Sequence, residues 1–126
     1  MDKVRMALVG CGGMGTRHLH GFKQLVGTPF DLIELSAVCD INPDNAEMAA
    51  VEAEQLLGVR PRVFIDMEAM VQQVPELEAV DVVTDPSAHH TICCQALDLG
   101  LHVLVEKPLA ITVRACRLII AAAARN

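Results

Sequence analysis

Aromatic side chains are almost absent from this sequence. Of its 126 residues three are Phe and none is Trp or Tyr, so aromatic residues make up 2% of the chain while hydrophobic residues make up 52%. A core built on large rings is therefore excluded, and the interior has to consist of aliphatic side chains. The length is that of one domain, which can bury roughly two-thirds of its unfolded surface. We therefore expect one domain over residues 1–126.

Positive charge and long hydrophobic runs are also scarce. The formal net charge is −6, from ten Lys and Arg against 16 Asp and Glu, which argues against a protein that binds nucleic acid by neutralising its phosphates. Charged side chains interrupt every stretch that is long enough to span a membrane, about 18 residues. The apolar stretch at residues 6–10 is too short for a secretory signal peptide. These absences predict a cytoplasmic protein that does not act at a membrane.

The cysteines follow no disulfide or metal-binding pattern. There are five of them, and none forms a Cys-x-x-Cys pair, so we expect reduced, buried thiols. Cys93 and Cys94 stand close to His89 and His90, but their spacing fits no standard structural zinc site, and a helix would splay the four side chains around its axis. No metal site is expected.

Short apolar runs alternate with longer amphipathic stretches along the whole chain. The apolar runs predict strands at residues 4–9, 32–39, 62–65, 79–84 and 102–105. The amphipathic stretches predict helices at residues 16–26, 43–57, 67–74 and 87–99, and a last helix that begins after Thr112 and runs to the end of the chain. Asn42, Asp66 and Thr112 are placed to cap helices.

The connections between these strands decide the fold class. No Asn-Gly or similar hairpin signal separates them, so the strands have to be parallel and joined by crossover helices. The expected fold is α/β: a doubly wound parallel Rossmann sheet of five strands in the order 3-2-1-4-5.

A glycine-rich loop follows the first predicted strand and opens the first predicted helix. Residues 10–15, GCGGMG, fit the pattern G-x-G-x-x-G, in which Gly10 allows a tight turn, Gly12 lets backbone approach a pyrophosphate, and Gly15 lets helix and strand pack closely. The free N–H groups of the helix N-terminus then face the phosphates. We expect this loop, Gly13 and Met14 included, to bind a dinucleotide; the alternative is a glycine-rich turn without a ligand.

Asp40 closes the second predicted strand, where an acid accepts hydrogen bonds from the adenine ribose. A carboxylate there would repel the 2′-phosphate of NADP. No Arg or Lys that could hold such a phosphate follows until Arg60. Asp40 therefore predicts NAD as the cofactor rather than NADP, unless it only caps a helix.

Three segments of the chain resemble the Gfo/Idh/MocA family of oxidoreductases. They are the glycine loop with His18 after it, residues 82–89 (VVTDPSAH), and residues 102–110 (HVLVEKPLA) with the family's Glu-Lys-Pro signature. The first segment is common to many dinucleotide folds, whereas the third, at the end of the fifth strand, is specific. The resemblance extends from Val4 to about Ala124.

The resemblance implies roles for residues at the ends of the fourth and fifth strands. Lys107 would lie beside the nicotinamide and the reacting carbon as the catalytic residue, aimed there by a cis peptide bond before Pro108. Glu106 would fix Lys107 or contact the nicotinamide ribose, and Thr84 and His89 would contact the cofactor. Without the resemblance, Glu-Lys-Pro is a polar strand end terminated by proline, and a His at a helix start is more often structural.

Asp85 departs from the family pattern, which has Pro or Asn-type residues at this position. Its carboxylate would either repel the cofactor's pyrophosphate or cap the next helix. His89 matches the family's histidine better than His90 does.

The family's second domain, which supplies the substrate pocket, an oligomerising sheet and an acid/base histidine, has no counterpart here, and neither has a sixth strand. We therefore expect the cofactor-binding part of a homo-oligomeric, NAD-dependent oxidoreductase that acts on a sugar, polyol or similar carbinol, inactive as an isolated fragment. The alternatives are a non-catalytic NAD-binding or sensing module and a scaffold piece with a vestigial loop.

Overall fold

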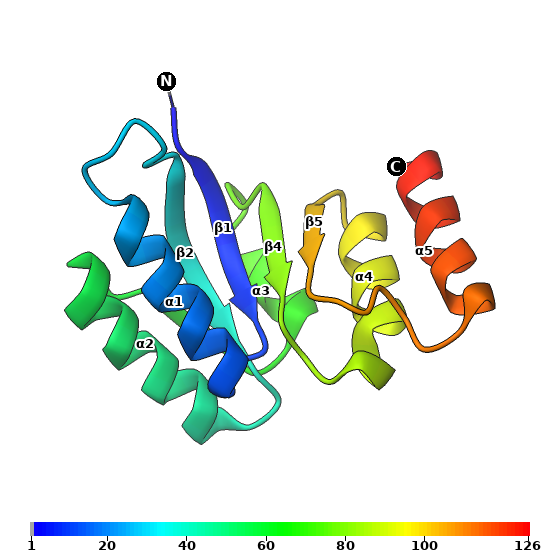
Figure 1. Ribbon diagram of the computed structural model, residues 1–126, viewed down its shortest axis with the longest axis horizontal. Helices are drawn as coiled ribbons and strands as arrows, with labels where there is room; N and C mark the ends of the chain where they lie inside the picture. The colour runs from blue at the N-terminus through cyan, green and yellow to red at the C-terminus, as the bar shows by residue number, and fades with distance from the viewer. Residues whose placement is uncertain (1) are drawn as a thin grey trace.

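Five parallel strands form one twisted sheet at the centre of the molecule (Figure 1). The computed structural model describes residues 2–126. The strands run in the order β3-β2-β1-β4-β5 and every neighbouring pair is parallel, which confirms the fold predicted from the sequence. Their bounds are β1 (Val4–Val9), β2 (Ile33–Cys39), β3 (Arg62–Phe64), β4 (Ala79–Val82) and β5 (His102–Val105).

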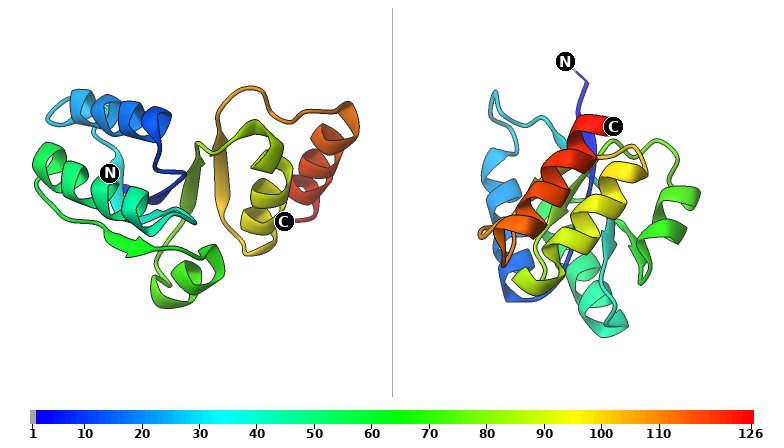
Figure 2. Two further views of the ribbon diagram at one scale, coloured as in Figure 1. Left: turned by 90° about the horizontal axis from the view of Figure 1, so that it is seen from below. Right: turned by 90° about the vertical axis from the view of Figure 1, so that its right-hand side faces the viewer.

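Helices cover the two faces of the sheet. They are α1 (Gly13–Leu25), α2 (Pro43–Leu57), α3 (Met67–Gln73), α4 (His89–Asp98) and α5 (Val113–Arg125), with a short 3₁₀ helix η1 (Pro86–Ala88) before α4. One buried cluster joins α1 and α2 to the sheet, and a second joins α3, α4 and α5 to its other face. Figure 2 shows α1 and α2 side by side, and α5 lying along α4.

The core is aliphatic. Along β1, Ala7 and Val9 point to the α3–α4 face, whereas Leu8 points to the α1–α2 face, as alternation along a strand requires. Of the three Phe residues only Phe64 is buried, and Phe30 is 71% exposed. All five cysteines are free thiols, three of them buried and two partly buried.

The predicted helix caps form as hydrogen bonds. The Asn42 side chain accepts from two N–H groups of the first turn of α2, with Pro43 at the first helical position. Asp66 caps α3 and Thr112 caps α5 in the same way, by accepting a backbone N–H three residues ahead. Each such cap stabilises its helix by about 0.5–2 kcal/mol.

The starts of two helices differ from those predicted. Helix α1 begins at Gly13 rather than at Thr16, because the carbonyl of Gly12 already accepts the N–H of Thr16 at 3.0 Å. Before α4, the chain forms η1, where Pro86 takes the first position and Asp85 the cap. No helix within residues 2–126 combines the length and the apolar character that crossing a bilayer demands.

Candidate functional site

A cavity of about 450 Å³ opens at the carboxyl ends of the strands. The glycine loop, the end of β2 and the segment after β4 all contribute to its wall. The predicted site residues that line it are Gly10, Gly12, Asp40 and Thr84, and Asp85 lines it as well. Ligands of open α/β sheets bind in this position, beyond the carboxyl ends of the strands.

Two glycines of the loop are required by the protein's own packing. Gly10 has φ +99°, and a Cβ on it would overlap the carbonyl oxygen of Val83. A Cβ on Gly15 would overlap the carbonyl oxygen of Gly10. These two glycines therefore bring the loop, α1 and β4 together, independently of any ligand.

Gly12 is different, because no atom of residues 2–126 occupies the space that its side chain would fill. A Cβ on Gly12 or on Gly13 would meet nothing within 4 Å, and Gly12 lines the cavity. Gly12 is also the N-cap of α1, where no side chain caps the helix and no acid stands in the first turn. Exposed N–H groups and the positive end of the helix dipole, with Met14 in this first turn, suit an anionic group such as a pyrophosphate.

Asp40 holds the glycine loop against the end of β2. Its Oδ2 accepts a hydrogen bond from the backbone N–H of Cys11 at 2.8 Å, and its Oδ1 accepts one from the N–H of Asn42 at 2.8 Å. Each carboxylate oxygen keeps a further lone pair, so Asp40 can also accept from a ribose hydroxyl in the cavity. Burial, and then the charge of Asp40, raise the pKa of the Cys11 thiol to about 12, so Cys11 supplies no thiolate.

Asp85 caps the turn that follows β4. Its Oδ1 accepts from the backbone N–H of Ser87 at 2.9 Å and from the Ser87 hydroxyl at 2.6 Å. These hydrogen bonds lower the pKa of the Asp85 carboxyl below its usual value. The capping role considered from the sequence is thus present, and a negative charge also stands at the cavity wall.

His89 lies inside the protein between two loops of the site. Its side chain is 0% exposed; Nδ1 lies 2.7 Å from the carbonyl oxygen of Pro108, and Nε2 lies 3.2 Å from that of Thr84. A ring nitrogen that carries a hydrogen can donate to the carbonyl oxygen that it faces. His89 therefore links the segment after β4 to the segment after β5, while a direct contact with a cofactor stays a prediction.

Glu106 and Lys107 follow β5 at the same edge of the sheet. The Glu106 Oε2 accepts from the backbone N–H of Lys107 at 3.0 Å, and the Lys107–Pro108 peptide bond is cis, as the resemblance implies. The Lys107 side chain is exposed, and no carboxylate within residues 2–126 forms an ion pair with it. Its ammonium is therefore available to a ligand.

A partly buried hydrogen-bonded cluster of three side chains is not predicted from the sequence as a cluster. His18 of α1 places Nδ1 2.6 Å from Asp81 Oδ2 and Nε2 2.9 Å from Glu106 Oε1. Asp81 belongs to β4 and is 0% exposed, and its other oxygen has no hydrogen-bond partner among residues 2–126. The signal was present in the sequence, because Asp81 is a charged residue inside an otherwise apolar strand.

Burial and hydrogen bonding act in opposite directions on the pKa values in this cluster. Burial acts to lower the pKa of His18, but its hydrogen bonds to Asp81 and Glu106 outweigh burial and raise it. Burial raises the pKa of Asp81, whereas the hydrogen bond from His18 lowers that of Glu106. The arrangement is that of an imidazolium that donates to two carboxylates.

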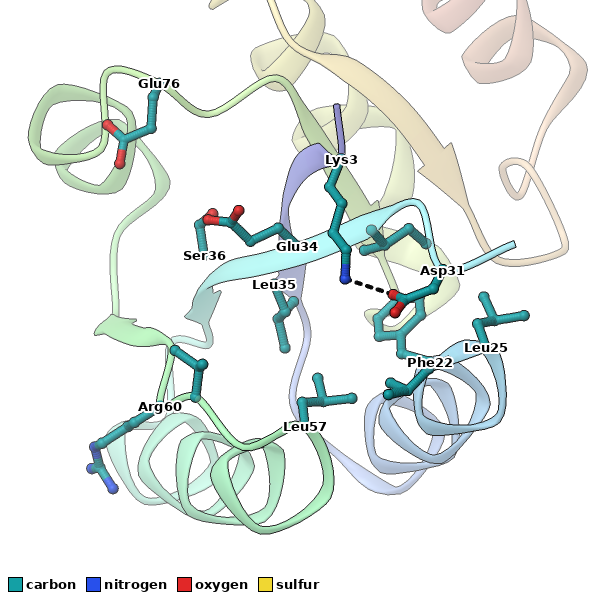
Figure 3. A pocket seen from close by; sticks show the side chains of 13 residues that line it. Lys3, Phe22, Leu25, Asp31, Glu34, Leu35, Ser36, Leu57, Arg60 and Glu76 are labelled. Atoms are coloured by element: carbon teal, nitrogen blue, oxygen red, sulfur yellow. Dashed lines mark hydrogen bonds and ion pairs between the residues drawn. The ribbon is translucent and has the colours of Figure 1, made fainter. Parts of the chain in front are cut away.

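A second cavity, of about 540 Å³, lies at the opposite, amino ends of the strands (Figure 3). Phe22, Leu25 and Leu57 line it, and Lys3 and Asp31 form an ion pair at its rim, 2.7 Å apart. None of the predicted site residues lies there, so the carboxyl-end cavity is the candidate site. Within residues 2–126, no group of His, Cys, Asp or Glu side chains is arranged to hold a metal ion.

The doubly wound sheet, the glycine loop at the start of α1 and the cavity beyond the strand ends define a dinucleotide-binding domain of the Rossmann type. Over residues 4–126 the chain matches the GFO/IDH/MocA model, described as an oxidoreductase family with an NAD-binding Rossmann fold. The chain belongs to this family.

Curated relatives and solved structures agree with this assignment. The chain is 31% identical over 113 residues to an inositol 2-dehydrogenase/D-chiro-inositol 3-dehydrogenase of Lactiplantibacillus plantarum, covering 90% of the chain and 30% of that protein. It is 30% identical over 118 residues to glycosyl hydrolase family 109 protein 1 of Akkermansia muciniphila, covering 90% and 23%. The myo-inositol dehydrogenase of Lactobacillus casei, solved with NAD(H) and myo-inositol, superimposes with a TM-score of 0.83 at 27% identity, covering 98% of the chain and 34% of that structure. The chain thus spans about a third or less of these relatives.

Proposed function

We propose that this chain is the cofactor-binding part of an NAD-dependent oxidoreductase that transfers hydride between nicotinamide and a carbinol carbon of a sugar or polyol. The observation that carries the proposal is the open space beside Gly12, at the uncapped start of α1 and in the wall of the 450 Å³ cavity. Packing explains Gly10 and Gly15 but not Gly12, and a bound pyrophosphate does explain it.

Each site residue then has a binding task along an extended dinucleotide. The loop from Gly10 to Gly15 donates backbone N–H groups to the pyrophosphate, and Asp40 accepts from the adenine ribose hydroxyls. Thr84, in the cavity wall, takes a place between the adenosine half and the nicotinamide half of the dinucleotide. Glu106 takes the nicotinamide end, and His89 links the segment after β4 to the segment after β5. When bound, NAD supplies the hydride acceptor at C4 of its nicotinamide.

Lys107 is the catalytic residue in this proposal. Its ammonium is free of ion pairs within residues 2–126, and the residue is exposed shortly after the end of β5. Hydrogen bonding from an ammonium to the substrate oxygen stabilises the charge that develops there as hydride leaves the carbon. The hydroxyl proton needs a separate base, which we assign to a substrate domain joined to this one, as the three- to fourfold greater length of the relatives suggests.

Two experiments test the proposal. The first is titration of the 126-residue chain with NADH, followed by nicotinamide fluorescence. We expect saturable binding and negligible turnover, and absence of saturation overturns the proposal as a whole. The same titration tests the scaffold alternative, which predicts that NADH does not bind.

The second experiment separates a catalyst from a non-catalytic NAD-binding or sensing module. It assays Lys107→Met, in a full-length protein that contains this domain, against a panel of inositols, sugars and glycosides. The glycosides are included because one relative bears the name of a glycosyl hydrolase. We expect turnover to fall about 100-fold or more while NADH affinity persists. Unchanged turnover contradicts the assignment of Lys107, and no turnover by the wild type on any substrate favours the sensing module.

A further inference from the structure

We propose that His18 and Asp81 are positioning residues that hold Glu106, and through it the backbone of Lys107, at the nicotinamide end of the site. The inference rests on the proposed function, because it assigns these two residues a task within that site. Neither residue lines the cavity that would take the adenosine half and the pyrophosphate.

The geometry joins three elements that are far apart in the sequence. Asp81 on β4 anchors Nδ1 of His18 on α1, at 2.6 Å, and Nε2 of the same ring reaches Oε1 of Glu106 after β5, at 2.9 Å. The other carboxylate oxygen of Glu106 accepts the backbone N–H of Lys107 at 3.0 Å. Both Glu106 oxygens therefore accept hydrogen bonds. Through Glu106 and His18, the backbone N–H of Lys107 is linked to α1 and β4.

A purely structural role explains this cluster poorly. Asp81 is fully buried and one of its oxygens has no partner in the described part of the chain, and an apolar residue at this position in β4 would avoid the cost of burying a carboxylate. The cluster ends at Glu106, which is partly exposed and follows the last strand of the sheet. Asp81, through His18, therefore fixes the one carboxylate that directly follows β5.

The charge state of His18 sets the strength of this link. The titratable groups that contact His18 are Asp81 from β4 and Glu106 after β5, and Lys107 stands beside Glu106. Because the two carboxylates raise the pKa of His18 above its ordinary value of 6.5, the imidazolium persists at pH 6.5 and donates to both. Above the raised pKa it loses one proton and one of the two hydrogen bonds.

The first test measures the link in the free protein. The pKa of His18 is followed by NMR of its ring in the wild type and in Glu106→Gln, which keeps the shape of the side chain and removes its charge. We expect the His18 pKa to fall in Glu106→Gln. An unchanged pKa overturns the inference, whether or not the chain binds NADH.

The second test compares NADH with ADP-ribose, which lacks the nicotinamide. His18→Asn keeps an amide at the position of Nδ1, so Asp81 retains a partner and the fold is preserved, but the reach to Glu106 is lost. We expect NADH binding to weaken about tenfold, since a hydrogen bond to a charged group is lost, and ADP-ribose binding to stay within about twofold. His18→Gln, which reaches the position of Nε2, should restore part of the NADH affinity.

His20→Gln is the matched control. His20 lies on the same helix and pairs with Glu52 of α2 at 2.8 Å, away from the site, so this variant should bind both ligands as the wild type does. In the wild type, NADH affinity should fall as the pH rises above 6.5 and through the raised pKa of His18, and this slope should be absent in His18→Asn.

The outcomes separate the two proposals. Equal losses for NADH and ADP-ribose in His18→Asn would mean that His18 supports the fold as a whole, and they overturn this inference while leaving the proposed function standing. If the wild type binds neither ligand, the proposed function fails, and this inference fails with it.

Discussion

The carboxylate of Asp40 accepts the backbone N–H of Cys11 at 2.8 Å, so the residue that closes β2 also holds the glycine loop in place. A residue expected to select the cofactor therefore has a second, structural task. Variants of Asp40 have to be chosen so that the two tasks can be told apart.

Asp40→Asn removes the charge but keeps an oxygen that can accept from the Cys11 N–H. We expect the wild type to bind NADH more tightly than NADPH, and this preference to shrink about tenfold in Asp40→Asn, because the repulsion of a 2′-phosphate is lost. Fluorescence titrations with both cofactors measure it. The control is Asp44→Asn, the same change on the first turn of α2. Wild-type affinity for NADPH equal to that for NADH contradicts the role given to Asp40.

Gly12→Ala should weaken NADH binding about tenfold or more while thermal stability stays nearly unchanged, because its Cβ meets no protein atom but would enter the space for a pyrophosphate. The matched control is Gly21→Ala, in the middle of α1, where a Cβ also meets nothing. There we expect unchanged NADH affinity and a gain in stability of about 0.5–1 kcal/mol. Equal NADH affinities of the two variants would refute the assignment of Gly12.

Gly15→Ala should destabilise the folded chain, whereas Gly12→Ala should leave its stability nearly unchanged. Its Cβ would overlap the Gly10 carbonyl oxygen, and the neighbour is backbone, which cannot turn aside as a side chain can. We expect a loss of about 1–3 kcal/mol in the free energy of unfolding, measured by urea denaturation without cofactor. A stability equal to that of the wild type would show that the loop shifts to accept the methyl group.

Asp85→Asn should strengthen NADH binding about two- to threefold, since it removes a negative charge from the cavity wall while Asn still caps the turn. The gain should shrink as salt is raised from 0.05 to about 0.5 M. Glu76→Gln, the same charge change beside the cavity at the amino ends of the strands, should have no effect. If both variants strengthen binding equally, the cause is net charge and not the position of Asp85.

The stability of the folded chain should depend on pH through His18. Its pKa is raised in the folded protein, so its contribution to stability is fully present below the ordinary value of 6.5 and is lost as the pH rises through the raised value. The free energy of unfolding of the wild type should fall as the pH is raised from 6 to 8.5. In His18→Asn it should depend less on pH. The measurement ends at pH 8.5 because the buried thiols, whose ordinary pKa is 9.0, add their own pH dependence to the stability at higher pH. Parallel curves for the two proteins would contradict this assignment.

Much of the fold follows from local chemistry. The five apolar runs, the caps at Asn42, Asp66 and Thr112 and the absence of hairpin turns predict the elements and their parallel order, and the structure confirms them. Helix α1 begins three residues before its predicted start, in the glycine loop, where local preference does not indicate a helix because glycines are poor helix formers. In the folded chain the close packing of Gly15 on Gly10 brings the first turn directly under the loop.

The site residues also fall into two groups: those that the sequence indicates and those that only the folded chain brings together. The sequence alone indicates the glycine loop and Asp40, because each depends on residue types at fixed spacing within one strand-to-helix connection, and it indicates the Glu-Lys-Pro segment through its resemblance to the family's signature. It does not indicate that His18, Asp81 and Glu106 meet, or that His89 bridges Thr84 and Pro108. Those contacts exist because parallel strands bring their carboxyl ends to one edge, while α1 crosses the face of the sheet and sets His18 against β4. Pairing across the sheet and burial between layers create these contacts, and neither is a property of any short stretch of chain.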